Sequence, residues 1–86
     1  MQRHTKIYYK YFDYGEQDII LCECCKRPAV DVHHVQGRGK GKDVIENLMA
    51  LCRLCHEMAN SSKLSKAELQ YIHNNVLVGN RKNFIK

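Results

Sequence analysis

The chain has 86 residues, of which 44% are hydrophobic, and it carries a formal net charge of +5. This length suits one small domain, whose limited core often needs a bound metal or disulfides for stability. No apolar run approaches the ~20 residues that span a bilayer, and the opening MQRHTKIYYKYFDYG lacks the apolar centre of a signal peptide. We therefore expect a cytoplasmic protein with no membrane segment, and the excess of cations suits a polyanionic partner.

The N-terminal segment is rich in tyrosine, with KIYYKYFDYG followed by EQDIIL. Aromatic residues are enriched in strands, so we expect a strand here, with a turn near Gly15. One face of a small core would then be covered by Ile7, Tyr9 and Tyr11. An alternative use of this segment is contact with nucleic acid through Tyr8 and Lys10.

The central segment predicts two strands with a basic loop between them. A strand from about Ala29 to Val35 follows a turn near Pro28, because proline suits the beginning of a strand. The loop QGRGKGKD alternates three glycines with cations. The next stretch, VIENLMALC, is a second strand or an irregular approach to one, and RLCHEMANS predicts a short helix.

The C-terminal segment predicts another helix over SKAELQYIHNN. Ser65 would be its N-cap, and Glu68 three residues later completes a capping-box pattern. Its apolar face would consist of Leu69, Tyr71, Ile72 and Val76. The basic tail GNRKNFIK would be loose unless Phe84 and Ile85 dock on the domain. His4 and His73 lie outside every motif, and we assign them no functional role.

Four of the five cysteines form two CxxC units. In a reducing cytoplasm this density and the odd count favour metal over disulfides, although buried or redox-active pairs are the alternative. Each unit presents two sulfurs in a tight turn, and four tetrahedral sulfurs are the standard structural zinc site. We predict one structural Zn²⁺ bound by Cys22, Cys25, Cys52 and Cys55. Cys24 remains as a spare thiol, or replaces Cys25 in a different register.

The two CxxC units flank the residues of a possible second site. His33 and His34 follow the first unit on the predicted strand, whereas His56 directly follows Cys55. His56 and Asn60 are four residues apart and so share one helix face. One zinc ion would therefore hold both walls of this second site.

The order DVHHV…ENLMALCRLCHEMAN resembles the HNH endonucleases, also called His-Me finger nucleases, over about residues 22–60. The resemblance rests on the cysteine spacing and on HH, ENL and LCxxCH in that order. It implies a small α+β fold, in which short flanking strand and helix segments surround a zinc-stabilised ββα-metal core. Residues 1–86 would then be a single nuclease domain, with an accessory helix and a basic tail over 61–86.

The resemblance also implies a role for each matched residue. His34 resembles the general base that activates water, and Asn47 resembles the residue that orients this base and its loop. The ligands of a catalytic divalent cation, such as Mg²⁺ or Mn²⁺, are matched by His33, His56 and Asn60. The x-P-x pattern that often follows the first strand in this family is replaced here by QGRGKGKD.

These residue types suit phosphodiester hydrolysis. A neutral imidazole can take a proton from water near working pH, and a divalent cation can offset charge on the scissile phosphate. The loop cations Arg38, Lys40 and Lys42 would contact flanking phosphates of DNA. We therefore predict a metal-dependent DNA endonuclease, of a kind frequent in phages and mobile elements and acting inside a bacterial or phage-infected cell.

Adjacent histidines make a structural demand, because successive side chains of a strand point to opposite faces. The backbone at His33 and His34 would have to depart from regular pleating for both rings to serve one site. The alternative function is a non-catalytic zinc-binding module for nucleic acid or protein, which would not explain the order of the histidines and Asn47. We expect a nuclease this small either to be weakly specific or to act as a homodimer or with a larger DNA-processing partner that chooses its target.

Overall fold

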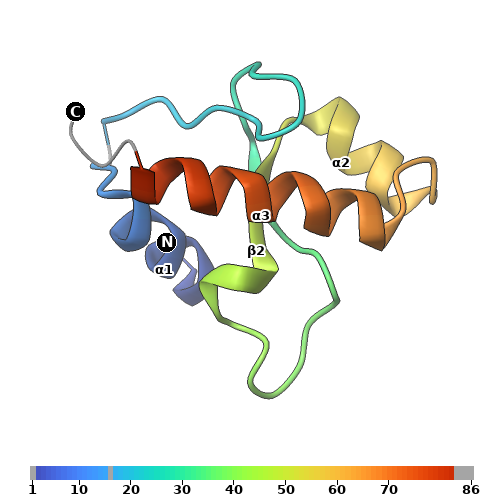
Figure 1. The fold of residues 1–86 in the computed structure, drawn as a ribbon, viewed down its shortest axis with the longest axis horizontal. Helices are drawn as coiled ribbons and strands as arrows, with labels where there is room; N and C mark the ends of the chain where they lie inside the picture. Colours follow the sequence, from blue (N-terminus) through green and yellow to red (C-terminus); the bar gives the residue numbers. More distant parts are fainter. Residues whose placement is uncertain (1, 16, 83–86) are drawn as a thin grey trace.

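A computed structural model describes residues 2–15 and 17–82 of the chain. In chain order its elements are α1 (Arg3–Phe12), β1 (Asp31–His34), the 3-10 helix η1 (Ile45–Asn47), β2 (Leu48–Leu51), α2 (Arg53–Asn60) and α3 (Lys66–Lys82). In Figure 1, α3 crosses the view in front of β2, with α1 near its C-terminal end and α2 near its N-terminal end. None of the helices in the described part of the chain has the length and apolar character that a bilayer crossing requires.

β1 and β2 pair as a two-stranded antiparallel sheet. Asp31 lies opposite Leu51 and His34 lies opposite Leu48. The two predicted strands, the loop between them and the short helix α2 are all present, so the predicted small α+β fold with a ββα core is confirmed. The helix α2 begins directly after β2, and both α1 and α2 contact the sheet.

The four residues of β2 are all buried, which suits the continuous apolar run LMAL. Because side chains alternate along a strand, Leu48 and Ala50 pack with α1 in one core cluster. Met49 and Leu51 belong to a second cluster, together with three buried cysteines. α3 contributes one buried leucine to each cluster, Leu69 and Leu77. The sheet is therefore covered on both faces, and α3 spans the two cores.

The tyrosine-rich segment forms the helix α1, so the predicted strand is wrong. Its buried residues are His4, Tyr8 and Phe12, which lie one turn apart on the face toward β2. The residues expected in the core are less buried: Ile7 and Tyr9 are half-buried and Tyr11 is exposed. Tyr8 is 2% exposed, which also rules out its predicted contact with nucleic acid. The preference of aromatic residues for strands depends on how they pack. Here a helix places Tyr8 and Phe12 on one face, where they pack with Leu48 and Ala50 of β2.

The capping box of α3 is confirmed. The Glu68 amide donates to Ser65 Oγ at 3.0 Å, and the Ser65 amide donates to Glu68 Oε1 at 2.9 Å. The helix continues to Lys82, so much of the tail that was expected to be loose is helical. Phe84 and Ile85 lie outside the described residues.

The predicted apolar face of α3 is only partly correct. Leu69 is buried, but Tyr71 is 71% exposed. His73, which was assigned no role, is fully buried at the next turn after Leu69. Because histidine is polar, the sequence did not indicate that the buried face of α3 runs from Leu69 through His73 to Leu77.

Candidate functional site

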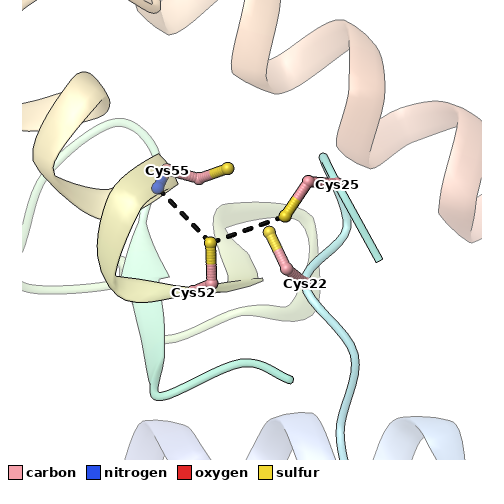
Figure 2. A group of neighbouring side chains, drawn as sticks. All are labelled: Cys22, Cys25, Cys52 and Cys55. Atoms are coloured by element: carbon pink, nitrogen blue, oxygen red, sulfur yellow. Dashed lines mark hydrogen bonds between the residues drawn. The ribbon is translucent and has the colours of Figure 1, made fainter. Parts of the chain in front are cut away.

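The four cysteines of the two CxxC units meet at one point (Figure 2). Cys52 and Cys55 come from the start of α2, and Cys22 and Cys25 from the turn that precedes β1. Their sulfur atoms all lie within 4.8 Å of one another. Four thiolates on one zinc ion, with bonds of about 2.3 Å, are about 3.8 Å apart. The cluster therefore fits a structural Zn²⁺.

A backbone hydrogen bond favours the metal-binding form of one of these cysteines, Cys52. The Cys55 amide donates to Cys52 Sγ at 3.4 Å, and Cys52 is the N-cap of α2. This hydrogen bond lowers the pKa of Cys52 to about 7, which favours the thiolate that binds zinc. Cys24 is not part of the cluster, and burial raises its pKa to about 11. A spare, protonated thiol is thus the better description of Cys24.

A second site lies along β1, in a cavity of about 370 Å³. All four residues of β1 line this cavity, and α2 forms the opposite wall. It brings together five of the residues predicted from the sequence: His33, His34, Arg38, His56 and Asn60. Asp31 and His4 also line it, although the sequence did not point to either. The two halves of the motif therefore share one cavity.

β1 keeps its regular pairing through His34, so the expected departure from pleating is wrong. The rings of His33 and His34 have different neighbours: the first lies near His56 of α2, and the second near His4 of α1. Both nevertheless line the cavity. The cavity therefore takes side chains from both faces of β1.

His33 and His56 form the part of the cavity that suits a cation. Their ring centroids are 5.0 Å apart, and His56 Nδ1 lies 3.1 Å from Asp31 Oδ2. Burial, followed by the nearby His56, lowers the pKa of His33, so its ring is neutral near pH 7 and can bind metal. Asn60 adds an amide oxygen one turn after His56. Two imidazoles and an oxygen donor resemble the nitrogen and oxygen ligand sets of divalent transition metals.

The side chain of His34 contacts the loop that follows β1. Its Nε2 lies 2.7 Å from Asp43 Oδ1, and its side chain is only 4% exposed. The His4 ring packs against it with centroids 4.5 Å apart. The sequence did not predict the contacts of His34 with Asp43 and His4, because both depend on how α1 and the loop pack against β1 in the tertiary structure.

Asn47 is buried and makes three hydrogen bonds to the same loop. Its Oδ1 accepts from the Gln36 amide at 2.7 Å. Its Nδ2 donates to the carbonyls of Gly37 and Lys42, at 3.1 and 3.0 Å. One amide side chain thus ties both ends of the loop together.

The loop itself depends on glycine. Gly37 and Gly41 have φ angles of 91° and 76°, in the left-handed region that side chains disfavour. The three loop cations, Arg38, Lys40 and Lys42, are all exposed. Of these, Arg38 lines the cavity, whereas Lys42 lies beside Asn47 in a separate depression.

The family model of the HNH endonucleases matches residues 22–62. The matched segment includes both CxxC units, both strands, η1 and α2, whereas α1 and α3 lie outside it. Comparisons of the chain with curated proteins and with solved structures returned no match. Residues 22–62, which include the cluster of four cysteines, are thus similar to the HNH endonucleases.

Proposed function

We propose that this protein is a metal-dependent endonuclease that hydrolyses DNA phosphodiester bonds. The observation that carries the proposal is the shared cavity, where His33 and His34 from β1 meet His56 and Asn60 from α2. A purely structural zinc module needs the four cysteines but has no use for such a cavity. The family match supports nuclease chemistry as the use of this site.

In this proposal His34 is the general base. It takes a proton from a water molecule, whose oxygen attacks the phosphorus of the scissile phosphate while the bond from phosphorus to the leaving 3′-oxygen breaks. His34 lines the cavity, although the residue is only 6% exposed. Asn47 acts as a positioning residue, because its three hydrogen bonds hold the loop that contacts His34.

His33, His56 and Asn60 would hold a divalent cation. When bound there, it would offset the negative charge that develops on the phosphate and the leaving oxygen. The four cysteines would hold the structural Zn²⁺ away from this cavity, where it would link the turn before β1 to the start of α2.

The exposed cations of the loop give the cavity a polyanion-binding rim. Arg38 reaches the cavity, and Lys40 and Lys42 extend the positive surface along the loop. Such contacts add affinity without sequence selectivity. The protein would therefore be weakly specific, or a homodimer or a larger DNA-processing partner would choose the target.

The test is cleavage of supercoiled plasmid by the zinc-loaded protein with Mg²⁺, with Mn²⁺ or with EDTA. We expect cation-dependent nicking that is lost in His34→Ala, while zinc content and melting temperature stay unchanged. Equal cleavage by parent and variant would refute His34 as the base. DNA binding on a gel without cleavage by either protein would instead favour the non-catalytic zinc module.

A further inference from the structure

We infer that Asp43 is a positioning residue for His34, which it holds as the tautomer whose Nδ1 is free to take a proton. The inference rests on the proposed nuclease function and adds a residue that lies outside the histidine and asparagine motif. Its basis is the contact between His34 Nε2 and Asp43 Oδ1 at 2.7 Å.

The chemistry of this contact determines where the ring proton sits. The hydrogen bond from His34 lowers the pKa of Asp43, so the carboxyl group is ionised near neutral pH. An ionised carboxylate can only accept a hydrogen bond. Nε2 of His34 must therefore carry the proton, and Nδ1 of the neutral ring remains as the lone-pair nitrogen.

Neighbouring groups keep the ring in this orientation. Its side chain is 4% exposed, and the His4 ring packs against it with centroids 4.5 Å apart. Burial, followed by the charge of His34, lowers the pKa of His4, so this neighbouring ring packs against His34 as an uncharged group. A ring flip, which would move Nε2 away from Asp43, is thus hindered by both contacts.

The position of Asp43 itself is determined by Asn47. The Asn47 amide binds the carbonyl of Lys42, the residue directly before Asp43, and also the carbonyl of Gly37 at the other end of the loop. The hydrogen bonds of the Asn47 side chain go to this loop. Asp43 is therefore the link through which the buried asparagine orients the histidine.

The first experiment measures the tautomer directly, without any need for activity. Nitrogen-15 NMR of the zinc-loaded protein at about pH 8, above the ordinary histidine pKa of ~6.5, reports which nitrogen of His34 is protonated. We expect the Nε2–H form in the parent and a shift toward the Nδ1–H form in Asp43→Asn. An Nδ1–H parent would overturn the inference, whatever its cleavage activity.

The second experiment compares the cleavage kinetics of Asp43→Asn, Asp43→Glu and a control, Asp13→Asn. Asp13 is exposed at the left-handed C-cap of α1, where asparagine is equally acceptable, so this variant matches the loss of charge alone. A comparable change in the buried triad of a serine protease costs about 10⁴-fold. Because Asp43 is 33% exposed, we expect a smaller loss of about 10–100-fold in kcat with KM nearly unchanged, and partial recovery in Asp43→Glu.

The outcomes separate this inference from the proposed function. Parent-like kcat and tautomer in Asp43→Asn, alongside an inactive His34→Ala, would refute only the role of Asp43. Full activity in His34→Ala would refute the proposed base. Should Asp43→Asn lose zinc or melt early, the parent tautomer and the kcat of Asp43→Glu would decide the question.

Discussion

Replacement of His73 by leucine should destabilise the domain strongly, because it breaks a buried ion pair. His73 is fully buried, and its Nδ1 lies 2.7 Å from Oε1 of Glu23, which is 5% exposed. Its Nε2 donates to the Ile45 carbonyl at 2.6 Å. Both ring nitrogens thus face acceptors, which requires a protonated ring. Although burial lowers the pKa of His73, the hydrogen bond and charge of Glu23 outweigh it and raise this pKa overall.

The second oxygen of Glu23 extends the network to the other elements. Oε2 accepts from Tyr8 Oη at 2.6 Å and from the Ala50 amide at 3.3 Å. One carboxylate therefore joins α1, β2 and α3 beside the cysteine cluster. In His73→Leu the carboxylate stays buried but loses its counter-ion.

Loss of one partner of a buried ion pair costs about 3–5 kcal/mol. For a domain of 86 residues, an unfolding entropy of about 2.1 cal/mol/K per residue converts this to a melting temperature lower by roughly 17–28 °C. The double variant Glu23→Gln/His73→Leu removes both charges, and we expect it to be more stable than the sum of the single effects predicts, by more than about 1 kcal/mol.

The measurement is thermal and urea denaturation at constant excess zinc, followed by circular dichroism. Asn75→Leu provides the control, because Asn75 is exposed on the same helix and should change stability by less than about 0.5 kcal/mol. A loss under about 1 kcal/mol in His73→Leu, or strict additivity in the double variant, would refute the ion pair.

Three further predictions concern pH, zinc and the loop. Because the pKa of His73 is raised, its contribution is complete below the unfolded pKa of ~6.5 and fades as pH rises through the folded pKa. The stability difference between parent and His73→Leu, measured by urea titration, should therefore shrink at alkaline pH; a constant difference would contradict this. Cys52→Ala should abolish zinc binding and cooperative melting, since such sites couple metal binding to folding; an undiminished melting transition would disprove the zinc cluster. Asn47→Ala removes three hydrogen bonds to the loop. It should lower the free energy of unfolding by about 1–3 kcal/mol and speed amide hydrogen exchange at Gly37. Exchange at the parent rate would contradict the role of Asn47 in holding the loop.

The amino-acid sequence by itself determined the features that depend on local spacing. Two CxxC units predicted the cysteine cluster, because each unit places two sulfurs in one turn. The pair Ser65 and Glu68 predicted the start of α3, since a capping box involves residues three apart. The family motif likewise indicated His33, His34 and His56, which the fold brings to one cavity.

Only the tertiary structure decided which distant residues meet. The segment that became α1 has aromatic residues at spacings that suit a strand or a helix, and its contact with β2 selected the helix. The partners of the polar buried groups are likewise far apart in sequence: Glu23 with His73, and His4 and Asp43 with His34. Hydrogen bonds between such groups have no sequence period, because they depend on how helices, loop and sheet are packed in space.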